Sequence, residues 1–477
     1  MSETSPAAVV ILAAGEGRRM KSRTPKVLHT LCGRTLLGHA LAAAGELDPS
    51  RLVVVVGHGR ELVSAEVAAV TPQALVVCQD QQLGTGHAVR MVTEAIGVIP
   101  GTVVLSYGDM PLLRGQTLRE LVDGHHRAGN AVTVLTARGG AAGYGRIVRG
   151  PDGAFLRIVE ERDATPAERA IDEWNSGCYA FDGTLLADAI KRVTTDNDQQ
   201  QEYLTDVVGI LRGDGHRVGT MLAADAGELT GVNDRVQLAQ ARRELNERIL
   251  EGWMRAGVTI IDPSSTWIDV TVTIGQDAEI GPQTQLQGAT VVGEGARIGP
   301  GCLLENTIVG EDAVVLHAVC RQAEIGPRAS VGPYAYLRPG TVLAQDAHVG
   351  AHVELKKAFV GAGAKVPHLT YVGDATIGAG ANIGAGTIFA NYDGRAKNHT
   401  TVGEHAFVGS NTVLVAPVVV GDGAYSAAGS VITDEVPAGD LGIARGRQHN
   451  SDGWTARNRP GSRSADAAQR VRSDDPV

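Results

Sequence analysis

Apolar and polar positions along the chain follow two different periods, and the change from one to the other falls near residue 260. Before it, short apolar or β-branched runs alternate with stretches of helical spacing. The runs are Ala8–Ala13, Leu52–Val56, Ala74–Cys78 and Thr102–Ser106, and the helical stretches include Leu36–Leu47 and Leu118–Ala128. This alternation predicts βαβ units in an α/β domain with a Rossmann-like, mixed but mostly parallel sheet covered on both faces.

A long helix is expected next. The segment from Asp234 to Met254 is rich in Gln, Ala, Arg, Glu and Leu and has no glycine before Gly252. Most of these residue types have high helix propensity. The segment therefore predicts a rigid connector within a helical linker over residues 234–262.

After the connector, aliphatic residues recur every six positions. The series are Ile274, Ile280, Leu286, Val292, Ile298 and Leu304, then Ile325, Val331, Leu337, Leu343 and Val349, and finally Val402, Val408, Leu414 and Val420. A fixed six-residue period predicts a parallel β-helix, in which each hexad forms one short strand and a turn. The aliphatic side chain would point into a narrow core. The glycine that often follows, as in Val408-Gly409, would take a turn conformation that other residues avoid.

The hexads set the remaining domain boundaries. We predict a first domain over residues 1–233, the β-helix over 263–454 and a disordered tail over 455–477, which is rich in Arg, Ser, Asp and Ala. The stretches Lys356–Lys365 and Phe389–Thr400 interrupt the six-residue period. Insertions in a solenoid loop out on one side and often carry its function.

Composition narrows the class of protein. The 477 residues carry a formal net charge of -10, with acidic and basic residues mixed, which argues against nucleic acid or a membrane as the main partner. The five cysteines are scattered and form no CxxC pair, so they indicate reduced thiols in a cytoplasmic protein. The apolar run from Val9 to Ala14 is too short to span a bilayer.

A glycine-rich turn follows the first predicted strand, where Leu12–Met20 leads into Pro25-Lys26. Backbone N–H groups of such a loop can approach a phosphate closely, helped by the N-terminus of a following helix. A dinucleotide fingerprint would need glycine where Met20 stands, whereas the cations Arg19 and Lys26 suit a triphosphate. A plain strand-to-helix turn with surface cations is the alternative interpretation at this point.

Two further polar turns follow predicted strands. Gln79 precedes the turn Leu83–His87, and Tyr107–Pro111 closes an apolar strand. Asp109 is therefore expected at the carboxyl end of a strand, where open α/β sheets bind ligands. A carboxylate there suits Mg²⁺, which takes one or two protein oxygens together with phosphate and water oxygens. A lone aspartate at the end of a strand can equally be a cap.

These motifs together resemble those of a known enzyme family. The stretches concerned are Leu12–Met20, Pro25-Lys26, Gln79–Gly86, Gly108–Pro111, Gly143–Arg146, Val159–Glu161, Asn175–Gly177 and Gly231–Asn233. From about Val9 to about Trp454, the chain is similar to the bifunctional N-acetylglucosamine-1-phosphate uridylyltransferase/glucosamine-1-phosphate acetyltransferases. One departure is Ser176, where the family usually has threonine.

The resemblance implies a nucleotide-sugar site in the first domain. The implied contacts with UTP and UDP-N-acetylglucosamine are Leu12, Ala13, Ala14, Gly15, Arg19, Lys26, Gln79, Gly84, Thr85, Tyr107, Gly108, Asp109, Gly145, Glu160, Asn175 and Asn233. Within this set, Gly145, Glu160 and Asn175 would hold the sugar, and Asp109 and Asn233 would hold one or two Mg²⁺ ions. Because the sugar phosphate itself attacks the α-phosphorus of UTP, the protein only has to position groups and neutralise charge.

The resemblance also implies that the β-helix is left-handed and carries the acetyltransferase site. Arg338 and Lys356 would bind the sugar phosphate, and Tyr371, Asn382 and Lys397 the amino sugar. The implied acetyl-CoA contacts are Ala385, Asn391, Tyr392, Ser410, Ala428 and Arg445. His368 becomes the general base, oriented by Glu354.

The residue types agree with this assignment. The attacking amine must lose a proton, and an imidazole with a near-neutral pKa can accept it. A lone histidine in a β-helix is more often a surface residue, but His368 and Glu354 are expected on adjacent coils among Arg, Lys, Asn and Tyr side chains. The family often has a basic residue where His399 stands.

The sequence thus predicts a cytoplasmic enzyme with two consecutive activities and no nucleic-acid or membrane partner. Acetyl-CoA would acetylate glucosamine 1-phosphate, and UTP would then convert N-acetylglucosamine 1-phosphate to UDP-N-acetylglucosamine and pyrophosphate. Solenoids often need neighbours to cover their faces, and the resemblance implies a homotrimer. Two alternatives are a nucleotidyltransferase whose β-helix is only structural, and a catalytically silent nucleotide sensor.

Overall fold

A computed structural model describes residues 5–473 of the chain. These residues form two compact units, Met1–Val292 with Leu303–Asn306, and Gly293–Cys302 with Thr307–Val477. Residues 1–4 of the predicted first domain and 474–477 of the predicted tail lie outside the described part. Within that part no helix combines the length and the apolar character needed to cross a bilayer. All five cysteines are free thiols.

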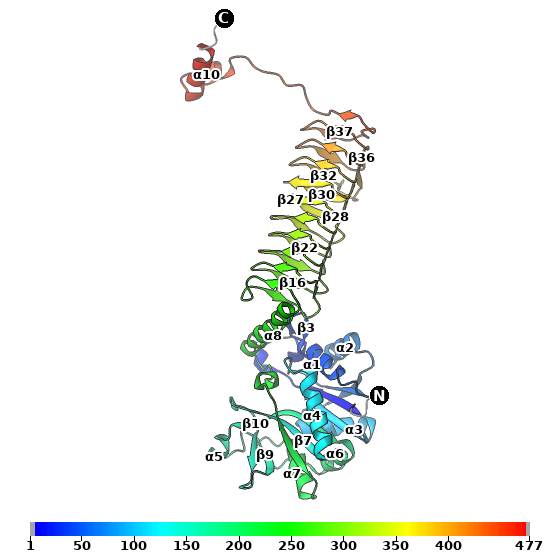
Figure 1. Cartoon of the computed structure of the whole chain (residues 1–477), viewed down its shortest axis with the longest axis vertical. Coiled ribbons are helices and arrows are strands. Elements are labelled where there is room, and N and C mark those ends of the chain that lie inside the picture. The colour runs from blue at the N-terminus through cyan, green and yellow to red at the C-terminus, as the bar shows by residue number, and fades with distance from the viewer. Residues whose placement is uncertain (1–4, 474–477) are drawn as a thin grey trace. The chain divides into compact units, whose positions relative to one another are not determined.

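The first unit is built on a mixed sheet with strand order β11-β7-β10-β6-β1-β4-β5; β8 pairs with β10, and β9 pairs with β8. Figure 1 labels β7, β9 and β10 of this sheet. Strand β1 pairs in parallel with β4 and β6, while β10 runs antiparallel to β6 and β7. The predicted mixed, mostly parallel sheet is confirmed. Its strands are β1 (Ala8–Ala13), β4 (Leu52–Val56), β5 (Leu75–Cys78), β6 (Thr102–Tyr107), β7 (Val132–Arg138), β8 (Arg146–Arg149), β9 (Phe155–Val159), β10 (Glu173–Asp182) and β11 (Val218–Leu222).

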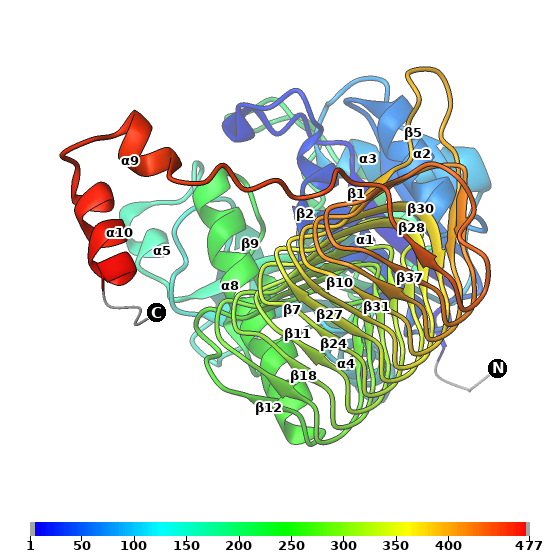
Figure 2. The same ribbon diagram turned by 90° about the horizontal axis from the view of Figure 1, so that it is seen from above.

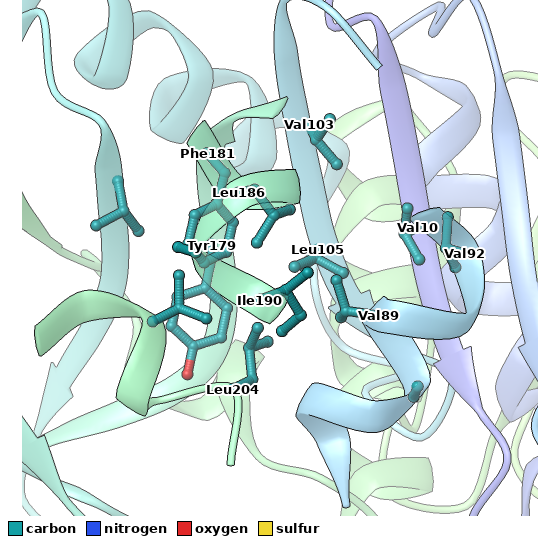
Figure 3. Packing of buried hydrophobic residues seen from close by; sticks show 14 of the residues in the cluster. Val10, Val89, Val92, Val103, Leu105, Tyr179, Phe181, Leu186, Ile190 and Leu204 are labelled. Atoms are coloured by element: carbon teal, nitrogen blue, oxygen red, sulfur yellow. The ribbon is translucent and has the colours of Figure 1, made fainter. Parts of the chain in front are cut away.

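Helices cover both faces of this sheet because successive strand residues point to opposite sides. Val10 of β1 belongs to a core with α3, α6 and α7, whereas Val9 and Ile11 belong to a second core with α1, α2 and α4. Figure 3 shows Val10, Val103 and Leu105 of the strands against Val89 and Val92 of α3. The helices are α1 (Leu36–Gly45), α2 (Arg60–Val70), α3 (Thr85–Ile96), α4 (Gly115–Ala128), α5 (Pro166–Arg169), α6 (Gly183–Ala189) and α7 (Asp206–Gly213).

Short elements complete the first unit. They are the hairpin β2 (Thr30–Leu31) and β3 (Arg34–Thr35) and the 3-10 helices η1 (Arg18–Met20), η2 (Lys26–Leu28), η3 (Ile190–Arg192) and η4 (Ala226–Leu229). The segment predicted to be a long helix forms α8 (Arg235–Arg255), which Asp234 caps by accepting hydrogen bonds from the amides of Val236 and Gln237. The helix continues through Gly252, because one glycine costs only about 1 kcal/mol in a helix of this length.

The hexads form short strands in both units. Those of the first unit are β12 (Thr259–Ile260), β13 (Trp267–Ile268), β14 (Thr273–Ile274), β15 (Glu279–Ile280), β16 (Gln285–Gln287), β17 (Val291–Val292) and β19 (Leu303–Glu305). Those of the second unit are β18 (Arg297–Ile298), β20 (Ile308–Val309), β21 (Val314–Val315), β22 (Val319–Arg321), β23 (Glu324–Ile325), β24 (Ser330–Val331), β25 (Tyr336–Leu337), β26 (Val342–Leu343), β27 (His348–Ala351), β28 (Glu354–Val360), β29 (Lys365–His368), β30 (Tyr371–Ile377), β31 (Asn382–Ile383), β32 (Ile388–Ala390), β33 (Thr400–Val402), β34 (Phe407–Val408), β35 (Val413–Val415), β36 (Val418–Val420), β37 (Tyr425–Ser426), β38 (Val431–Ile432) and β39 (Leu441–Gly442).

The second unit is a parallel β-helix, as predicted. Val331 pairs with Val349, which stands three hexads later, so three hexads complete one coil. The strands of successive coils lie side by side, as β24 and β27 do in Figure 2. Val315, Val349, Val366, Ile383 and Val408 are fully buried and form one column of the core.

The structure gives a different reason for Gly409, one of the glycines that follow a core residue. Gly409 does not have a positive φ, so it does not take a conformation that other residues avoid. A Cβ atom at Gly409 would instead lie 2.5 Å from the carbonyl oxygen of Ser426 on the next coil. Gly409 is therefore required because neighbouring coils approach closely. The predicted positive φ is found at Gly299 and Gly332, which also follow core residues. Other positive-φ positions are occupied by residues such as Tyr334, His352 and Asn411.

In the range where the sequence predicts a disordered tail, the structure has two helices, α9 (Trp454–Asn458) and α10 (Arg463–Ser473). Alanine contributes to this difference, because it has the highest helix propensity and recurs through α10. Ala465 is also buried, with 6% of its surface exposed.

Candidate functional sites

A cavity of about 500 Å³ opens in the first unit. It lies beside the ends of β1 and β6, where open α/β sheets bind ligands. The residues from the predicted nucleotide-sugar set that line it are Leu12, Ala13, Ala14, Gly15, Lys26, Gln79, Gly84, Thr85, Tyr107, Asp109, Gly145, Glu160, Asn175 and Asn233. Two predicted residues do not line it: Gly108 is buried against Ala13, and Arg19 is exposed.

The glycine turn after β1 is open to the cavity at Gly15, where an added Cβ would have no neighbour within 4 Å. Gly17 has a φ of 65°, and a Cβ there would lie 2.5 Å from the Cβ of Lys26. Glycine is thus needed at position 17 for the close approach of the lysine. The predicted helix after this turn is only the 3-10 turn η1, so it supplies little helix dipole. The full helix that begins at the cavity is α3, whose first residue is Thr85.

Lys26 joins two oxygen ligands from distant parts of the chain. Its Nζ donates a short hydrogen bond to Oδ2 of Asp109, which follows β6, and another to Oδ1 of Asn233 at 3.1 Å. The Lys26 and Asp109 side chains are only 12% and 18% exposed. A carboxylate and an amide oxygen that converge on one cation match the ligands that Mg²⁺ takes from proteins, with phosphate and water oxygens completing its coordination.

Asn175 and Glu160 line another part of the cavity. Asn175 lies at an irregularity of β10, where its Oδ1 accepts from the amide of Gly177 at 3.0 Å and its Nδ2 donates to Oη of Tyr179 at 2.8 Å. Glu160 accepts a hydrogen bond from Oγ1 of Thr205 at 3.2 Å. Burial raises the pKa of the Glu160 carboxyl, although the Thr205 hydrogen bond opposes this shift. This part of the cavity therefore presents fixed polar groups to a ligand.

Sequence reasoning missed one wall of the cavity. It comes from residues 197–205, which we name the glutamine loop, and its lining residues are Gln199, Gln201, Tyr203 and Thr205. The polar run that contains the loop predicted no strand or helix and carried no recognisable motif. Tyr144, stacked on Trp174 with ring centroids 4.2 Å apart, was also missed as a lining residue.

Backbone and side-chain contacts hold the glutamine loop against the turn before α3. The amide of Glu202 donates to the carbonyl of Leu83, and its own carbonyl accepts from Gly86, both at 2.8 Å. The Glu202 carboxylate accepts two hydrogen bonds from the Arg90 guanidinium, at 2.7 and 3.1 Å. A paired geometry of this kind adds directional specificity to the charge attraction. The loop is thus a positioned part of the cavity wall.

The second unit brings the predicted acetyltransferase residues onto neighbouring coils. Glu354 of β28 lies in register with Tyr371 of β30, and its Oε1 accepts from Nη1 of Arg338 at 2.9 Å. Among the hydrogen bonds of the described residues, none joins Glu354 to His368. The predicted orienting role of Glu354 stays a prediction.

His368 ends β29 with an exposed side chain, and its backbone is held in place. Its carbonyl oxygen accepts from Oγ1 of Thr370 at 2.7 Å and from the amide of Gly386 at 3.2 Å. The same inter-coil bond repeats from Asn411 to Ala385 and from Gly429 to Ser410. His368 and the predicted acetyl-CoA contacts Ala385, Ser410 and Ala428 therefore form one column along the coils. Arg445 joins this column by donating to the carbonyl of Ala428 at 2.9 Å.

A second group of polar residues surrounds Lys356. Its Nζ donates to Oδ2 of Asp374 at 3.1 Å, and the same oxygen accepts a short hydrogen bond from Nδ2 of Asn391. Lys397 lies close enough for the Lys356 ammonium to lower the pKa of Lys397. Sequence reasoning missed Asp374, which stands in a strand without a motif of its own.

The remaining predicted residues lie near these groups. Asn382 of β31 pairs with Lys365 of β29. Tyr392 is 60% exposed and donates from Oη to the carbonyl of Gly394 at 2.8 Å. Oγ1 of Thr376 and Nε2 of His399 lie 3.0 Å apart.

Comparison with known proteins covers almost the whole chain. Residues 9–217 match the MobA-like NTP transferase domain, and residues 271–306 match the bacterial transferase hexapeptide repeats. The chain is 60% identical over 472 residues to the "Bifunctional protein GlmU" of Streptomyces avermitilis, which covers 98% of both chains. It is 58% identical over 478 residues to the protein of that name from Thermobifida fusca, which covers 99% of both, and 51% identical over 477 residues to that of Corynebacterium efficiens, covering 99% of this chain and 98% of the relative.

Proposed function

The chain belongs to the GlmU family of bifunctional transferases, and we propose that its two polar sites carry out the two consecutive reactions of that family. The site in the second unit acetylates glucosamine 1-phosphate with acetyl-CoA. The cavity in the first unit transfers UMP from UTP to N-acetylglucosamine 1-phosphate and releases pyrophosphate. The observation that carries the proposal is the separate clustering of polar residues in each unit, around Lys26 in the first and around His368 and Lys356 in the second.

Uridylyl transfer needs charge neutralisation and alignment. A phosphate oxygen of the sugar attacks the α-phosphorus of UTP, and the bond to the bridging oxygen of pyrophosphate breaks. Lys26, the amides around Gly15 and the N-terminus of α3 at Thr85 would neutralise the phosphates. Asp109 and Asn233 would hold Mg²⁺, which supplies Lewis-acid stabilisation of the charge on the phosphoryl oxygens. Lys26 would then pass from these oxygens to the nucleotide.

Glu160, Asn175 and Tyr144 would select the sugar. The Glu160 carboxylate can accept hydrogen bonds from sugar hydroxyls, and the Asn175 amide, fixed by Tyr179 and Gly177, can bind a further polar group. The face of Tyr144 that Trp174 leaves free can pack against a sugar or its acetyl group.

Acetyl transfer needs a free amine and a held thioester. His368 would accept the proton of the glucosamine ammonium, the nitrogen would attack the thioester carbonyl, and the C–S bond would break to release the CoA thiol. Arg338 and Lys356 would hold the sugar phosphate, and Tyr371, Asn382 and Lys397 the sugar. The column formed by Ala385, Ser410 and Ala428 would guide the CoA chain along the coils.

Omission of single reagents tests the proposal. The full chain is mixed with glucosamine 1-phosphate, acetyl-CoA, UTP and Mg²⁺, and each is left out in turn. We expect N-acetylglucosamine 1-phosphate to accumulate without UTP, and neither product to form without acetyl-CoA. A nucleotidyltransferase with a purely structural β-helix would make UDP-N-acetylglucosamine only from supplied N-acetylglucosamine 1-phosphate. A silent nucleotide sensor would make no product under any condition.

We also propose a homotrimer in the cytoplasm. The second unit exposes an apolar column on its outer surface, in which the ring of Phe407 stacks on that of Tyr425, and Tyr425 pairs in register with Leu441. Exposed apolar columns of this kind favour contact with another copy of the chain. Light scattering of the purified chain gives its mass in solution, and a monomer would contradict the assembly.

The proposed location in the cytoplasm rests on the cysteines. Free cysteines are typical of the reducing cytoplasm.

A further inference from the structure

Asp374 is a carboxylate at the centre of the second polar site to which no role has been assigned above. It lies in β30 with a φ of 49°, and its side chain is 18% exposed. One oxygen, Oδ2, accepts hydrogen bonds from both the Lys356 ammonium and the Asn391 amide. A partly buried carboxylate shared by two donors is rigid, because moving it would cost both hydrogen bonds.

The two donors belong to different structural parts. Lys356 lies on β28, whereas Asn391 begins residues 391–398, which we name the polar insertion. The polar insertion folds back on itself, since the amide of Asn398 donates to the carbonyl of Asn391 at 2.7 Å and Tyr392 forms an antiparallel bridge with Lys397. The position of Asn391 therefore also sets the position of Lys397.

Close packing at the neighbouring Gly373 also fixes this arrangement. A Cβ atom at Gly373 would lie 2.5 Å from Nδ2 of Asn391 and 2.6 Å from Oη of Tyr371. The amide and the phenol therefore meet over Gly373, directly beside Asp374. The hydrogen bond to Asp374 and the packing against Gly373 together hold the side chain of Asn391 in place. Position 373 must be glycine because a Cβ atom there would clash with this side chain.

Charge also links Asp374 to Lys397. The groups that act on Lys397 are Lys356, Asp374 and Arg338, and Lys356 lowers the pKa of Lys397 while Asp374 opposes that effect. A phosphate dianion is bound best when the cations around it are all protonated. Removing the negative charge of Asp374 would leave Lys356 and Lys397 to repel each other.

We propose that Asp374 is a positioning residue of the acetyltransferase site. It holds Lys356 and the polar insertion so that Lys356 receives the phosphate, and Lys397 the sugar, of the amino sugar phosphate. The proposal rests on the acetyltransferase function proposed above. Asp374 itself does not touch the reacting atoms, so its loss should weaken binding of the sugar phosphate more than it slows the chemical step.

The test compares Asp374→Asn with the parent in the full chain. We expect the KM for glucosamine 1-phosphate to rise about 10- to 100-fold, the usual effect of losing a charged hydrogen-bond partner. The kcat and the KM for acetyl-CoA should each stay within about threefold. The variant Asp374→Glu keeps the charge and should recover part of the lost affinity. The matched control is Asp434→Asn, an exposed aspartate in the same unit, which should leave both constants unchanged.

A pH profile separates positioning from a merely structural effect. Without Asp374 the pKa of Lys397 should fall further, so the alkaline limb of kcat/KM for glucosamine 1-phosphate should move to lower pH. An unchanged KM, or a fall in kcat alone, would overturn the proposal. If Asp374→Asn does not fold, Asp374→Glu is tested in its place. Its KM for glucosamine 1-phosphate should then be higher than that of the parent, and the alkaline limb of its kcat/KM should lie at lower pH than that of the parent. A parent chain that acetylates no amino sugar would refute the proposed function instead.

Discussion

The ammonium group of Lys26 donates a hydrogen bond of 3.1 Å to the side-chain oxygen of Asn233, although the two residues stand 207 positions apart. Beside the cavity, this contact joins the segment that follows β1 to the residues just before α8. Lys26 also contacts Asp109, so one cation satisfies both proposed metal ligands. The site is thus preformed around a positive charge, which lowers the cost of bringing its oxygen ligands together.

The first prediction concerns Asp109. Asp109→Asn keeps the shape of the side chain but removes its charge, so binding of Mg²⁺ and uridylyl transfer should both weaken. Because a bound ion supplies several kcal/mol of charge stabilisation, we expect kcat/KM to fall on the order of a hundredfold or more. The assay follows pyrophosphate release during a Mg²⁺ titration.

Acetyl transfer by the same Asp109 variant is the internal control and should be unchanged. Asp152→Asn, in an exposed turn of the same unit, provides the matched control for uridylyl transfer. A near-parental rate across the Mg²⁺ titration would exclude Asp109 as a metal ligand.

The second prediction concerns His368. His368→Ala removes the proposed base but leaves the backbone hydrogen bonds of residue 368 in place. Acetyl transfer should fall about 10²- to 10⁴-fold, the usual contribution of a general base. Raising the pH should recover part of the rate, because more of the amine is then unprotonated.

Uridylyl transfer from supplied N-acetylglucosamine 1-phosphate should be unaffected in the His368 variant, because His368 belongs to the second unit. Loss of both activities in a folded variant would mean that the two reactions share a site. Undiminished acetylation would return His368 to the role of a surface residue.

The third prediction uses the pH dependence of Glu160. Burial raises the pKa of this carboxyl, so it becomes protonated at a higher pH than an exposed glutamate. The protonated carboxyl accepts hydrogen bonds from sugar hydroxyls less well than the carboxylate does. The KM for N-acetylglucosamine 1-phosphate should therefore rise as the pH falls through this raised pKa. In Glu160→Gln the KM should be higher at neutral pH and should lose this component of its pH dependence.

The sugar phosphate itself titrates with a second pKa of about 6, so the informative quantity is the difference between the parent and the Glu160 variant. Glu120→Gln, on the exposed side of α4, should reproduce the parent profile. Parallel profiles for the parent and Glu160→Gln would show that the Glu160 carboxylate does not bind the sugar.

The fourth prediction concerns the stability of the first coil of the β-helix, which is formed by β12, β13 and β14. The buried side chain of Asn246 on α8 donates to the carbonyl of Thr266 at 2.8 Å and accepts from the amide of Ile268 at 3.1 Å. Asn246→Ala would leave both buried backbone groups without these partners, at a cost of roughly 1–3 kcal/mol each. We expect a lower thermal midpoint and faster hydrogen exchange at the Ile268 amide.

Gln240→Ala, at an exposed position of α8, is the control and should change neither quantity. If the Ile268 amide remains as protected in Asn246→Ala as in this control, the asparagine does not hold the first coil to the helix.

The architecture could be predicted from the sequence because local side-chain periodicity determines it. Val9, Val10 and Ile11 alternate between the two cores that the sheet separates, and an apolar run followed by a helical segment already predicts that arrangement. In the β-helix, the residues that recur at multiples of six positions, such as Val331 and Val349, form the core. The six-residue period therefore predicts the core directly. The family motifs could be recognised for a similar reason, because each motif is a short segment with its own local geometry. They predicted most of the cavity residues that the resemblance implied.

What tertiary structure alone decided depends on contacts between segments that have no common local pattern. No spacing in the sequence indicates that Lys26 meets Asn233, that Glu202 fastens the glutamine loop to the turn before α3, or that Asp374 lies between Lys356 and Asn391. The need for glycine at position 409 also arises from the next coil and not from its own φ. Local sequence patterns therefore predict the periodic framework and the motif positions, while the packing of distant segments sets which charged groups face each other.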